Sequence, residues 1–254
     1  MDGLGTGSHQ HVSFEHKRMK KLITFSLWGD DPKYRTGALR NIELAPKFYP
    51  GWTLRFYVAK DDCGKCNSGM AHEFTRWNYQ DEFVETDTQV ELVLVDEPAD
   101  WRGMFWRFRP ASEDDVDVFI SRDCDSRLSN REAAAVQEWL DGPKLVHSMG
   151  DHPYHFNPSQ ALMGGMFGMK RHAFPQMAKL IDEFCQQYPD AWQCDQDFLK
   201  QHVFPLVAHK VHATSDIHPG CHKFPIPRDG DNFIGAIIGP NEEKLHPEHH
   251  AMVK

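Results

Sequence analysis

The stretch Val116-Asp-Val-Phe-Ile-Ser-Arg-Asp-Cys-Asp-Ser-Arg127 joins an apolar run to two acids that stand one residue apart. The apolar run predicts a short buried strand, because consecutive β-branched and aromatic residues are typical of strands covered on both faces. In open α/β sheets, ligands bind beyond the carboxyl ends of such strands. Two carboxylates at that position can converge on a hard divalent cation and leave coordination positions free for phosphate oxygens.

An Asp-x-Asp tripeptide by itself is also common on protein surfaces. Asp123 and Asp125, however, follow a buried strand and stand beside Arg122 and Arg127. This position favours a metal site, and we predict that both aspartates bind Mg²⁺ or Mn²⁺.

The segments on either side of this stretch alternate between strand and helix patterns. This alternation predicts one α/β domain with a central sheet flanked by helices. The predicted strands are residues 22–27, 53–59, 90–95, 116–120, the glycine-rich run 161–169, and 205–211, which would deliver His212. The predicted helices lie around residues 38–45, at 129–140 after a capping box, from 177 to 188, and at 195–204.

The composition is that of a globular protein. Hydrophobic residues make up 40% of the 254 residues and charged residues 26%, which excludes a wholly disordered chain. No apolar run approaches the ~20 residues that a membrane-spanning helix needs. Residues 1–19 lack the features of a secretory signal, and we expect a disordered leader or an expression remnant there. The domain is predicted over 20–240 and an exposed tail over 241–254, and the expected location is the cytoplasm.

Charge and cysteine content narrow the function classes. The net charge of −9 makes general nucleic-acid binding unfavourable, because nucleic-acid binders present a basic face. Six arginines and no lysine lie between Trp101 and Arg131, and arginine is suited to binding phosphate oxygens. Cys63-Gly-Lys-Cys66 has a spacing seen in zinc and redox sites, but no second pair accompanies it, so a loop with free thiols is the favoured interpretation.

Eight segments together resemble a family of small nucleotide-sugar-dependent glycosyltransferases of the GT-A fold. The family occurs in bacterial surface-polysaccharide clusters and in large DNA viruses of algae. The resemblance spans roughly residues 20–240 and rests on Phe25-Ser-Leu-Trp-Gly29, Pro32-Lys-Tyr34, Gly37-Ala38, Pro50-Gly-Trp52, Arg55-Phe-Tyr-Val58, Ile120-Ser-Arg-Asp-Cys-Asp-Ser-Arg127, Asp151-His-Pro-Tyr-His155 and Asp195-Gln196. It implies a Rossmann-like domain with a mixed, mostly parallel sheet.

The resemblance also implies a metal and donor site. Asp123 and Asp125 would hold Mn²⁺ or Mg²⁺ against the diphosphate of a UDP- or GDP-sugar, with Asp125 as the firmer direct ligand. A histidine near the C-terminus would be the third ligand, and we expect His212, with His218 as the alternative. Lys223 would contact the phosphates, and Asp195, with Gln196 beside it, would lie next to the reacting sugar carbon.

Further donor-site residues are expected from their chemistry. Arg107 lies among aromatic residues just before the Asp-x-Asp strand, and Arg122 lies at its end. The resemblance places Ser26, Leu27 and Trp28 at the base and ribose. Gly164 and Gly165 would let the sugar lie close to the backbone, and Asp151, in a turn, would bind sugar hydroxyls or act as a base. For Arg107, Trp28, Asp151 and Asp195, a purely structural role in core, turn or helix cap is the alternative.

The predicted function is a metal-dependent transfer of a sugar from a nucleotide diphosphate sugar, UDP being favoured, to a hydroxyl of a glycan or glycoprotein. Retention of anomeric configuration is slightly favoured, and inversion would need Asp151 or Asp195 as base. For a viral chain, the expected location is the host cytoplasm. The alternatives are a phosphoryl-transfer enzyme with Asp123 as nucleophile, a sugar nucleotidyltransferase, and a carbohydrate-binding protein without turnover.

Overall fold

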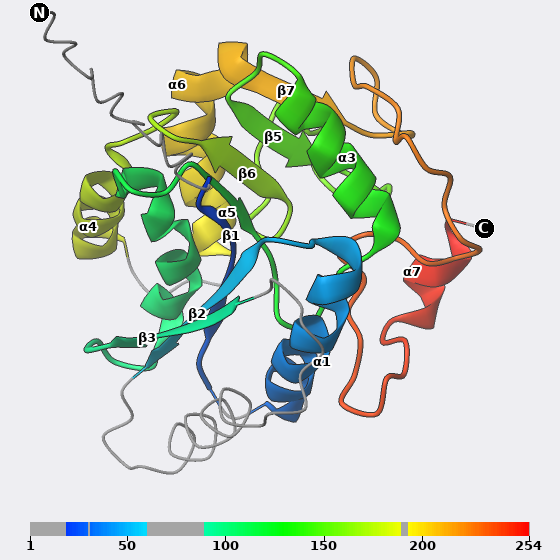
Figure 1. Cartoon of the computed structure of the whole chain (residues 1–254), viewed down its shortest axis with the longest axis horizontal. Helices are drawn as coiled ribbons and strands as arrows, with labels where there is room; N and C mark the ends of the chain where they lie inside the picture. The colour runs from blue at the N-terminus through cyan, green and yellow to red at the C-terminus, as the bar shows by residue number, and fades with distance from the viewer. Residues whose placement is uncertain (1–18, 30, 60–88, 189–192, 254) are drawn as a thin grey trace, which may run out of the picture.

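The computed structural model describes residues 19–29, 31–59, 89–188 and 193–253. They form an α/β domain in which helices flank both faces of a seven-stranded sheet of order β3-β2-β1-β4-β6-β5-β7 (Figure 1). Every pair is parallel except β4–β6 and β6–β5, so β6 alone among these strands runs against its neighbours. This arrangement confirms the predicted mixed, mostly parallel sheet.

The strands are short and mostly buried. β1 lies between β2 and β4, and its side chains point into two different cores: Leu22 into one, Ile23 and Phe25 into the other. The bounds are β1 Lys21–Leu27, β2 Thr53–Ala59, β3 Gln89–Val95, β4 Val118–Ser121, β5 Val146–Met149, β6 Phe167–Lys170 and β7 Val211–Thr214.

Side-chain caps mark the start of α1 and of α3. Asp31 accepts a hydrogen bond from the backbone N–H of Lys33 at the start of α1, and Ser129 accepts one from Glu132 at the start of α3. The bounds are α1 Pro32–Phe48, η1 Trp101–Ser112, α3 Asn130–Asp141, α4 Met177–Gln187, α5 Cys194–Phe198, η2 Leu199–Val203, α6 Phe204–Val207, η3 Ala208–Lys210 and α7 Pro247–Ala251. None of the helices in these ranges is both long and apolar enough to cross a bilayer.

Two apolar cores lie on opposite faces of the sheet. α1 and α3 pack on one face, where Ala38, Ile42 and Trp139 are buried. η1, α4 and α5 pack on the other, where Phe105, Phe184 and Phe198 form an aromatic cluster (Figure 1). The carboxyl end of β4 therefore lies close to both η1 and α1. The candidate functional site lies at this edge of the sheet.

Several expectations are corrected. The glycine-rich run is a strand only from Phe167; residues 161–163 have no regular structure and a turn and bend follow at 164–166. Pro205 does not end the helix, and the strand predicted over 205–211 is helical up to Lys210: α6 follows directly on the π-helical turn η2, and only Val211 belongs to β7. β5 has no counterpart in the prediction, because its four residues carry too little pattern.

Most described residues of the segment predicted as an exposed tail are exposed. His250 and Val253 are buried, however, and Nδ1 of His250 lies 2.8 Å from the carbonyl oxygen of Asp231, so the end of the segment contacts the domain. The predicted leader up to residue 18 lies outside the described residues, as does the pair Cys63 and Cys66.

Candidate functional site

The site begins at the carboxyl end of β4, where Asp123 and Asp125 follow Ser121. Asp125 is only 8% exposed, whereas the side chain of Asp123 is 42% exposed. Burial, together with the neighbouring carboxylate of Asp123, raises the pKa of Asp125 to about 6, and Lys33 and Arg107 oppose this rise. Ionisation of both carboxylates at once is therefore unfavourable, because each negative charge repels the other and Asp125 is buried.

Helix α1 braces the loop that carries these acids. The amide of Asn41 donates to the carbonyl of Ser126 at 2.9 Å, and its oxygen accepts from the N–H of Leu128 at 3.0 Å. Asn41 is 1% exposed. A buried amide that satisfies both a donor and an acceptor of the loop fixes the loop's conformation.

Arg107 joins the two ends of the site. Its buried guanidinium pairs with Asp123 and, through Nη2, lies 3.2 Å from Oδ2 of Asp195. Its backbone N–H donates to Oγ of Ser26 at 3.1 Å. Arg107 therefore connects η1, the end of β1, the Asp-x-Asp loop and α5.

Asp195 and Gln196 form a hydrogen-bonded pair beside Arg107. Nε2 of Gln196 donates to Oδ2 of Asp195 at 3.0 Å, and Oε1 of Gln196 accepts from the N–H of Gly164 at 3.1 Å. Burial raises the pKa of Asp195, the charge of Arg107 lowers it, and the charge of Asp123 adds to the rise. The net direction is upward, so this carboxylate gains affinity for a proton.

Two consecutive glycines cover this group of polar side chains. A Cβ at Gly165 would lie 1.8 Å from Oδ2 of Asp123. A Cβ at Gly164 would lie 2.6 Å from Nη2 of Arg107 and 2.8 Å from Oδ2 of Asp195. Both positions therefore require glycine, and the backbone runs directly over the acids.

Lys33 and Tyr34, from the first turn of α1, also lie at the site. The charge of Lys33 lowers the pKa of Asp125, and the charges of Asp125 and Asp123 raise that of Tyr34, which burial raises most. The segment Pro32-Lys-Tyr34 contributed to the family resemblance, but the sequence analysis assigned it no role. The resemblance was the only available signal for this pair.

His155 and His218, from two loops, lie within electrostatic range of each other, and the charge of Asp123 also acts on His155. Burial lowers the pKa of His155 to about 3, and the charge of His218 lowers it further, whereas that of Asp123 opposes the change. Nε2 of His218 is buried and has no hydrogen-bond partner. His218, the alternative third ligand of the sequence analysis, thus carries a ring nitrogen that is free to bind.

Among the residues at the end of the first strand, Ser26 contacts the site by its hydrogen bond with Arg107. Leu27 and Trp28 pack against apolar clusters instead. Leu27 is 6% exposed and belongs to the core. Trp28 is half-buried and packs against Gly103, where a Cβ would lie 2.4 Å from its Cδ1 atom, and against the apolar cluster that contains Trp106. Leu27 therefore offers no side-chain surface to a ligand.

Arg122 lies away from the site, contrary to the expectation that it binds the donor. It is 1% exposed and forms an ion pair with Glu132 at 3.4 Å on the α3 side of the sheet. Its Nη1 donates to the carbonyl of Ser121 at 2.8 Å. Arg122 therefore enters the core on the α3 side, whereas Asp123 pairs with Arg107 of η1.

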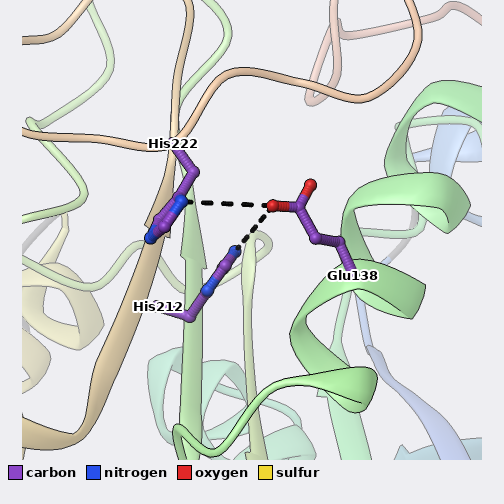
Figure 2. Close-up of side chains that lie close together, drawn as sticks. All are labelled: Glu138, His212 and His222. Atoms are coloured by element: carbon purple, nitrogen blue, oxygen red, sulfur yellow. Dashed lines mark ion pairs between the residues drawn. The ribbon is translucent and has the colours of Figure 1, made fainter.

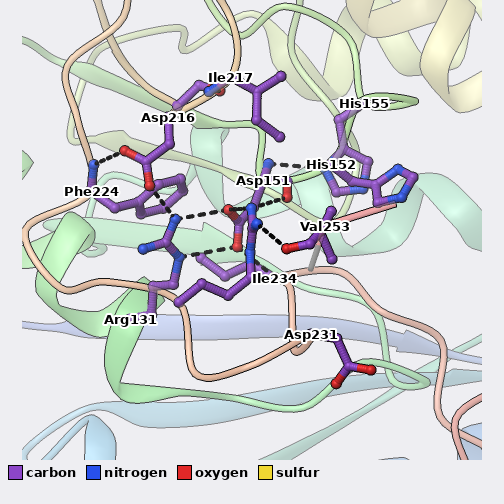
Figure 3. Close-up of polar contacts among 12 residues, drawn as sticks. Arg131, Asp151, His152, His155, Asp216, Ile217, Phe224, Asp231, Ile234 and Val253 are labelled. Carbon is purple, nitrogen blue, oxygen red and sulfur yellow. Dashed lines mark hydrogen bonds and ion pairs between the residues drawn. The ribbon is translucent and has the colours of Figure 1, made fainter. Parts of the chain in front are cut away.

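Asp151 is also corrected, because it is fully buried rather than open to a substrate (Figure 3). Nη2 of Arg131 and Nη2 of Arg228 donate to its Oδ1 at 2.8 and 2.6 Å. Nε of Arg131 and the N–H of Ile234 donate to Oδ2, each at 3.1 Å. Four donors occupy the carboxylate, which therefore joins segments of the fold and cannot act as a base.

His212, expected as third ligand, lies elsewhere. β7 is separated from β4 by β6 and β5, so His212 is about three strand spacings, or ~14 Å, from the Asp-x-Asp strand. One metal ion cannot contact both. His212 lies instead beside Glu138 and His222 (Figure 2). Lys223 is exposed, and its Nζ donates to the carbonyl of Asp216 at 2.7 Å within its own loop.

The donor set suits a hard divalent ion. Asp123 and Asp125 supply carboxylate oxygens, which Mg²⁺ and Mn²⁺ prefer, and no cation of the described chain forms an ion pair with Asp125. The raised pKa of Asp125 indicates negative charge that a bound cation would relieve. These residues therefore fit such an ion.

A separate cavity of about 700 Å³ lies between the start of α3 and residues 226–238. Its lining includes Arg127, Arg131 and Ile238, but none of the acids of the site. Ile238 donates its N–H to the carbonyl of Asp125 at 2.8 Å, so the cavity adjoins the Asp-x-Asp loop.

Comparisons with known proteins give a structural match. No family model matches the chain, and no curated protein matches it. A mannosyltransferase from Pyrobaculum calidifontis, in complex with GDP-mannose and Mn²⁺, has a similar structure with a TM-score of 0.50 and 15% identity, over 85% of this chain and 59% of the other. This chain thus spans about three fifths of that protein's length.

Two further structures are similar at lower scores. One is a glycosyltransferase involved in the glycosylation of the major capsid of PBCV-1, with a TM-score of 0.45 and 13% identity over 76% of this chain and 80% of the other. The other is 4-diphosphocytidyl-2C-methyl-D-erythritol synthase from Anaerococcus prevotii, with a TM-score of 0.45 and 7% identity over 78% and 89%. The match to the mannosyltransferase shows that this chain has the GT-A fold.

Proposed function

We propose that this chain is a metal-dependent glycosyltransferase that transfers a sugar from a nucleotide diphosphate sugar to a hydroxyl of a glycan or glycoprotein. One observation carries the proposal: Asp123 and Asp195 pair with Arg107 at the carboxyl end of a central strand, and the charge of Arg107 also acts on Asp125. In open α/β sheets this edge is where ligands bind.

Asp123 and Asp125 are the proposed ligands of Mn²⁺ or Mg²⁺. When bound, the ion would offset the negative charge that develops on the leaving diphosphate. His218 replaces His212 as the proposed third ligand. Two observations support it: its buried, unpartnered Nε2, and the charges of His218 and Asp123 that both act on His155.

The other side chains would position the donor. Arg107 fixes the orientation of Asp123 and Asp195, as the two ion pairs support. Lys33 is the proposed phosphate contact, with Lys223 second, since the charge of Lys33 acts on Asp125. Ser26 and the exposed part of Trp28 would bound the base and ribose. Gly164 and Gly165 let the backbone lie directly against Asp123, Arg107 and Asp195, so that these side chains would stand beside the sugar.

Asp195 and Gln196 are the proposed residues at the reacting carbon. Asp195 is 4% exposed and faces Arg107, Gln196 and the turn at Gly164. In a retaining reaction, its negative charge would stabilise the positive charge that develops at the anomeric carbon while the leaving phosphate assists the acceptor. In an inverting reaction, its raised pKa would suit a base for the acceptor hydroxyl. We favour retention.

UDP is the proposed nucleotide, and the proposed location is the cytoplasm. GDP-sugars belong in the test as well, because the mannosyltransferase of similar fold was determined with GDP-mannose. The acceptor is proposed only as a class, a glycan or glycoprotein hydroxyl.

The test measures donor cleavage by the full chain. UDP-, GDP- and dTDP-sugars are incubated with and without Mn²⁺, and the released nucleotide is identified. We expect release of a nucleoside diphosphate from one donor, dependent on Mn²⁺ and abolished in Asp125→Asn. Release of a nucleoside triphosphate with added pyrophosphate would indicate a nucleotidyltransferase. A phospho-aspartate at Asp123 would indicate phosphoryl transfer, and binding without release a carbohydrate-binding protein.

A further inference from the structure

A second group of metal-binding side chains lies on the opposite side of the sheet from η1. Figure 2 shows Glu138 of α3, His212 of β7 and His222 of the following segment pointing toward one another. Oε1 of Glu138 is 3.9 Å from Nε2 of His212 and 4.0 Å from Nδ1 of His222. One ligand atom from each residue lies within 4.8 Å of the other two.

The backbone fixes both histidines. His212 is paired with His147 across the parallel strands β5 and β7. The N–H of His222 donates to the carbonyl of Ala213 at 2.8 Å, and the N–H of Ser215 donates to the carbonyl of His222 at 2.8 Å. The two imidazole rings stack at 4.2 Å with an angle of 9°. The backbone positions of the two histidines therefore follow from the sheet, and the exposed ring of His222 is free to turn toward Glu138.

His212 provides an independent indication of a ligand. It is 7% exposed, and its Nε2 has no hydrogen-bond partner although it faces Glu138. Buried polar atoms without a partner are uncommon in native proteins and call for a binding partner. Burial and the neighbouring His222 lower the pKa of His212 to about 4, so the ring is in its neutral, metal-binding form at pH 7.

We propose that Glu138, His212 and His222 bind a zinc-class transition-metal ion, distinct from the ion at Asp123 and Asp125. Two imidazoles and one carboxylate form a donor set that Zn²⁺ accepts, with water as the fourth ligand. Tetrahedral ligand atoms around Zn²⁺ lie about 3.4 Å apart. From the observed separations of 3.9 and 4.0 Å, binding requires the exposed side chain of Glu138 to move inward. It also requires the exposed ring of His222 to rotate out of its stack with His212, because a ring nitrogen binds a metal in the plane of its ring.

The ion would tie the segment after β7 to α3. Between the two histidines lie Asp216, which pairs with Arg131 at 2.6 Å, and His218. A bound ion that joins His222 to Glu138 would hold the far end of this segment against α3. The role is structural, and it does not depend on the proposed sugar transfer.

The test compares Zn²⁺ binding by four full-length proteins: wild type, His222→Ala, Glu138→Gln, and His209→Ala as the matched control. The side chain of His222 is 61% exposed, so its removal leaves the fold intact, and His209 is exposed and lies outside the group. Many other histidines can bind Zn²⁺ weakly, so only differences between the variants count.

We expect wild type and His209→Ala to retain one more equivalent of Zn²⁺ after gel filtration than His222→Ala. At Zn²⁺ about one hundred times its Kd, their Tm should rise by about 5 °C or more above the rise in His222→Ala. Glu138→Gln should behave as His222→Ala does, and in chelator all four proteins should melt alike. Equal Zn²⁺ content and equal Tm shifts in wild type and His222→Ala would overturn the proposal.

Discussion

Asp125 is held in a charged state that its surroundings disfavour. Its pKa is raised to about 6 in the folded chain, chiefly by burial and then by Asp123, from 3.8 as the ordinary value. Protonated Asp125 thus contributes to the free energy of unfolding. This contribution is complete below pH ~4 and is lost as the pH rises to about 6. Above that range the charged Asp125 opposes folding, by at most about 3 kcal/mol.

Asp125→Asn should therefore raise Tm in chelator at pH 7.5 and leave it nearly unchanged at pH ~4. The measurement is thermal unfolding at the two pH values. Asp114→Asn serves as control, because Asp114 is exposed and its removal should change neither Tm. A loss of stability at pH 7.5 in Asp125→Asn would contradict the electrostatic account.

Asp195 is predicted to act on turnover rather than on metal binding. Replacing it with asparagine keeps the volume and the contact with Gln196 but removes the negative charge beside Arg107. We expect Asp195→Asn to lower kcat by about 100- to 10,000-fold. Mn²⁺ affinity should stay within a few-fold, and loss of Mn²⁺ binding would place Asp195 among the ligands instead. The comparison needs donor-hydrolysis rates and a Mn²⁺ titration.

At the scale of elements, the turn before β6 sets the space above the acids. A methyl group at Gly165 would collide with Oδ2 of Asp123 at 1.8 Å, so the carboxylate or the turn must move. Gly165→Ala should abolish Mn²⁺-dependent donor binding. Gly142→Ala is the matched control, because its Cβ would meet only carbonyl oxygens at 3.5 Å. Wild-type donor affinity in Gly165→Ala would show that the turn does not shape the site.

The carboxylate of Asp151 joins three elements: the end of β5, the start of α3 and the segment that includes Arg228 and Ile234 (Figure 3). Asp151→Asn removes a buried charge that faces two arginines. We expect the free energy of unfolding to fall by about 3–5 kcal/mol. Asp216→Asn should cost less, since that side chain is 37% exposed. Equal losses in urea titrations of the two variants would argue against the buried network.

Local pattern was sufficient for what the sequence predicted correctly. The strands at 22–27, 53–59 and 90–95 and the capped helix after Ser129 depend on neighbouring residues, and all four are confirmed. The errors concern partners from distant segments. Neither the pairing of Asp151 with Arg228 nor the distance between His212 and Asp123 can be read from spacing, because both depend on strand order.

At the scale of the whole molecule, the fold explains why the acids meet. β1 and β4 are adjacent and parallel, so their carboxyl ends open on the same edge. η1 reaches this edge through Arg107, and α1 reaches it through Lys33 and Asn41. β6 returns antiparallel beside β4 and places the Gly164 turn over the acids, where Ser121 donates to the carbonyl of Gly164 at 2.6 Å. The candidate site is thus assembled from β1, η1, α1 and the turn before β6, around the end of β4.

The most direct measurement is calorimetric titration of UDP and GDP into the full chain, in Mn²⁺ and in chelator, for wild type and Asp125→Asn. At least one nucleotide should bind the wild type at least about tenfold more tightly with Mn²⁺, a difference of about 1.4 kcal/mol. In Asp125→Asn this gain should vanish. Identical affinity of wild type in Mn²⁺ and chelator, or an undiminished gain in the variant, would mean that these carboxylates do not hold a metal–diphosphate complex.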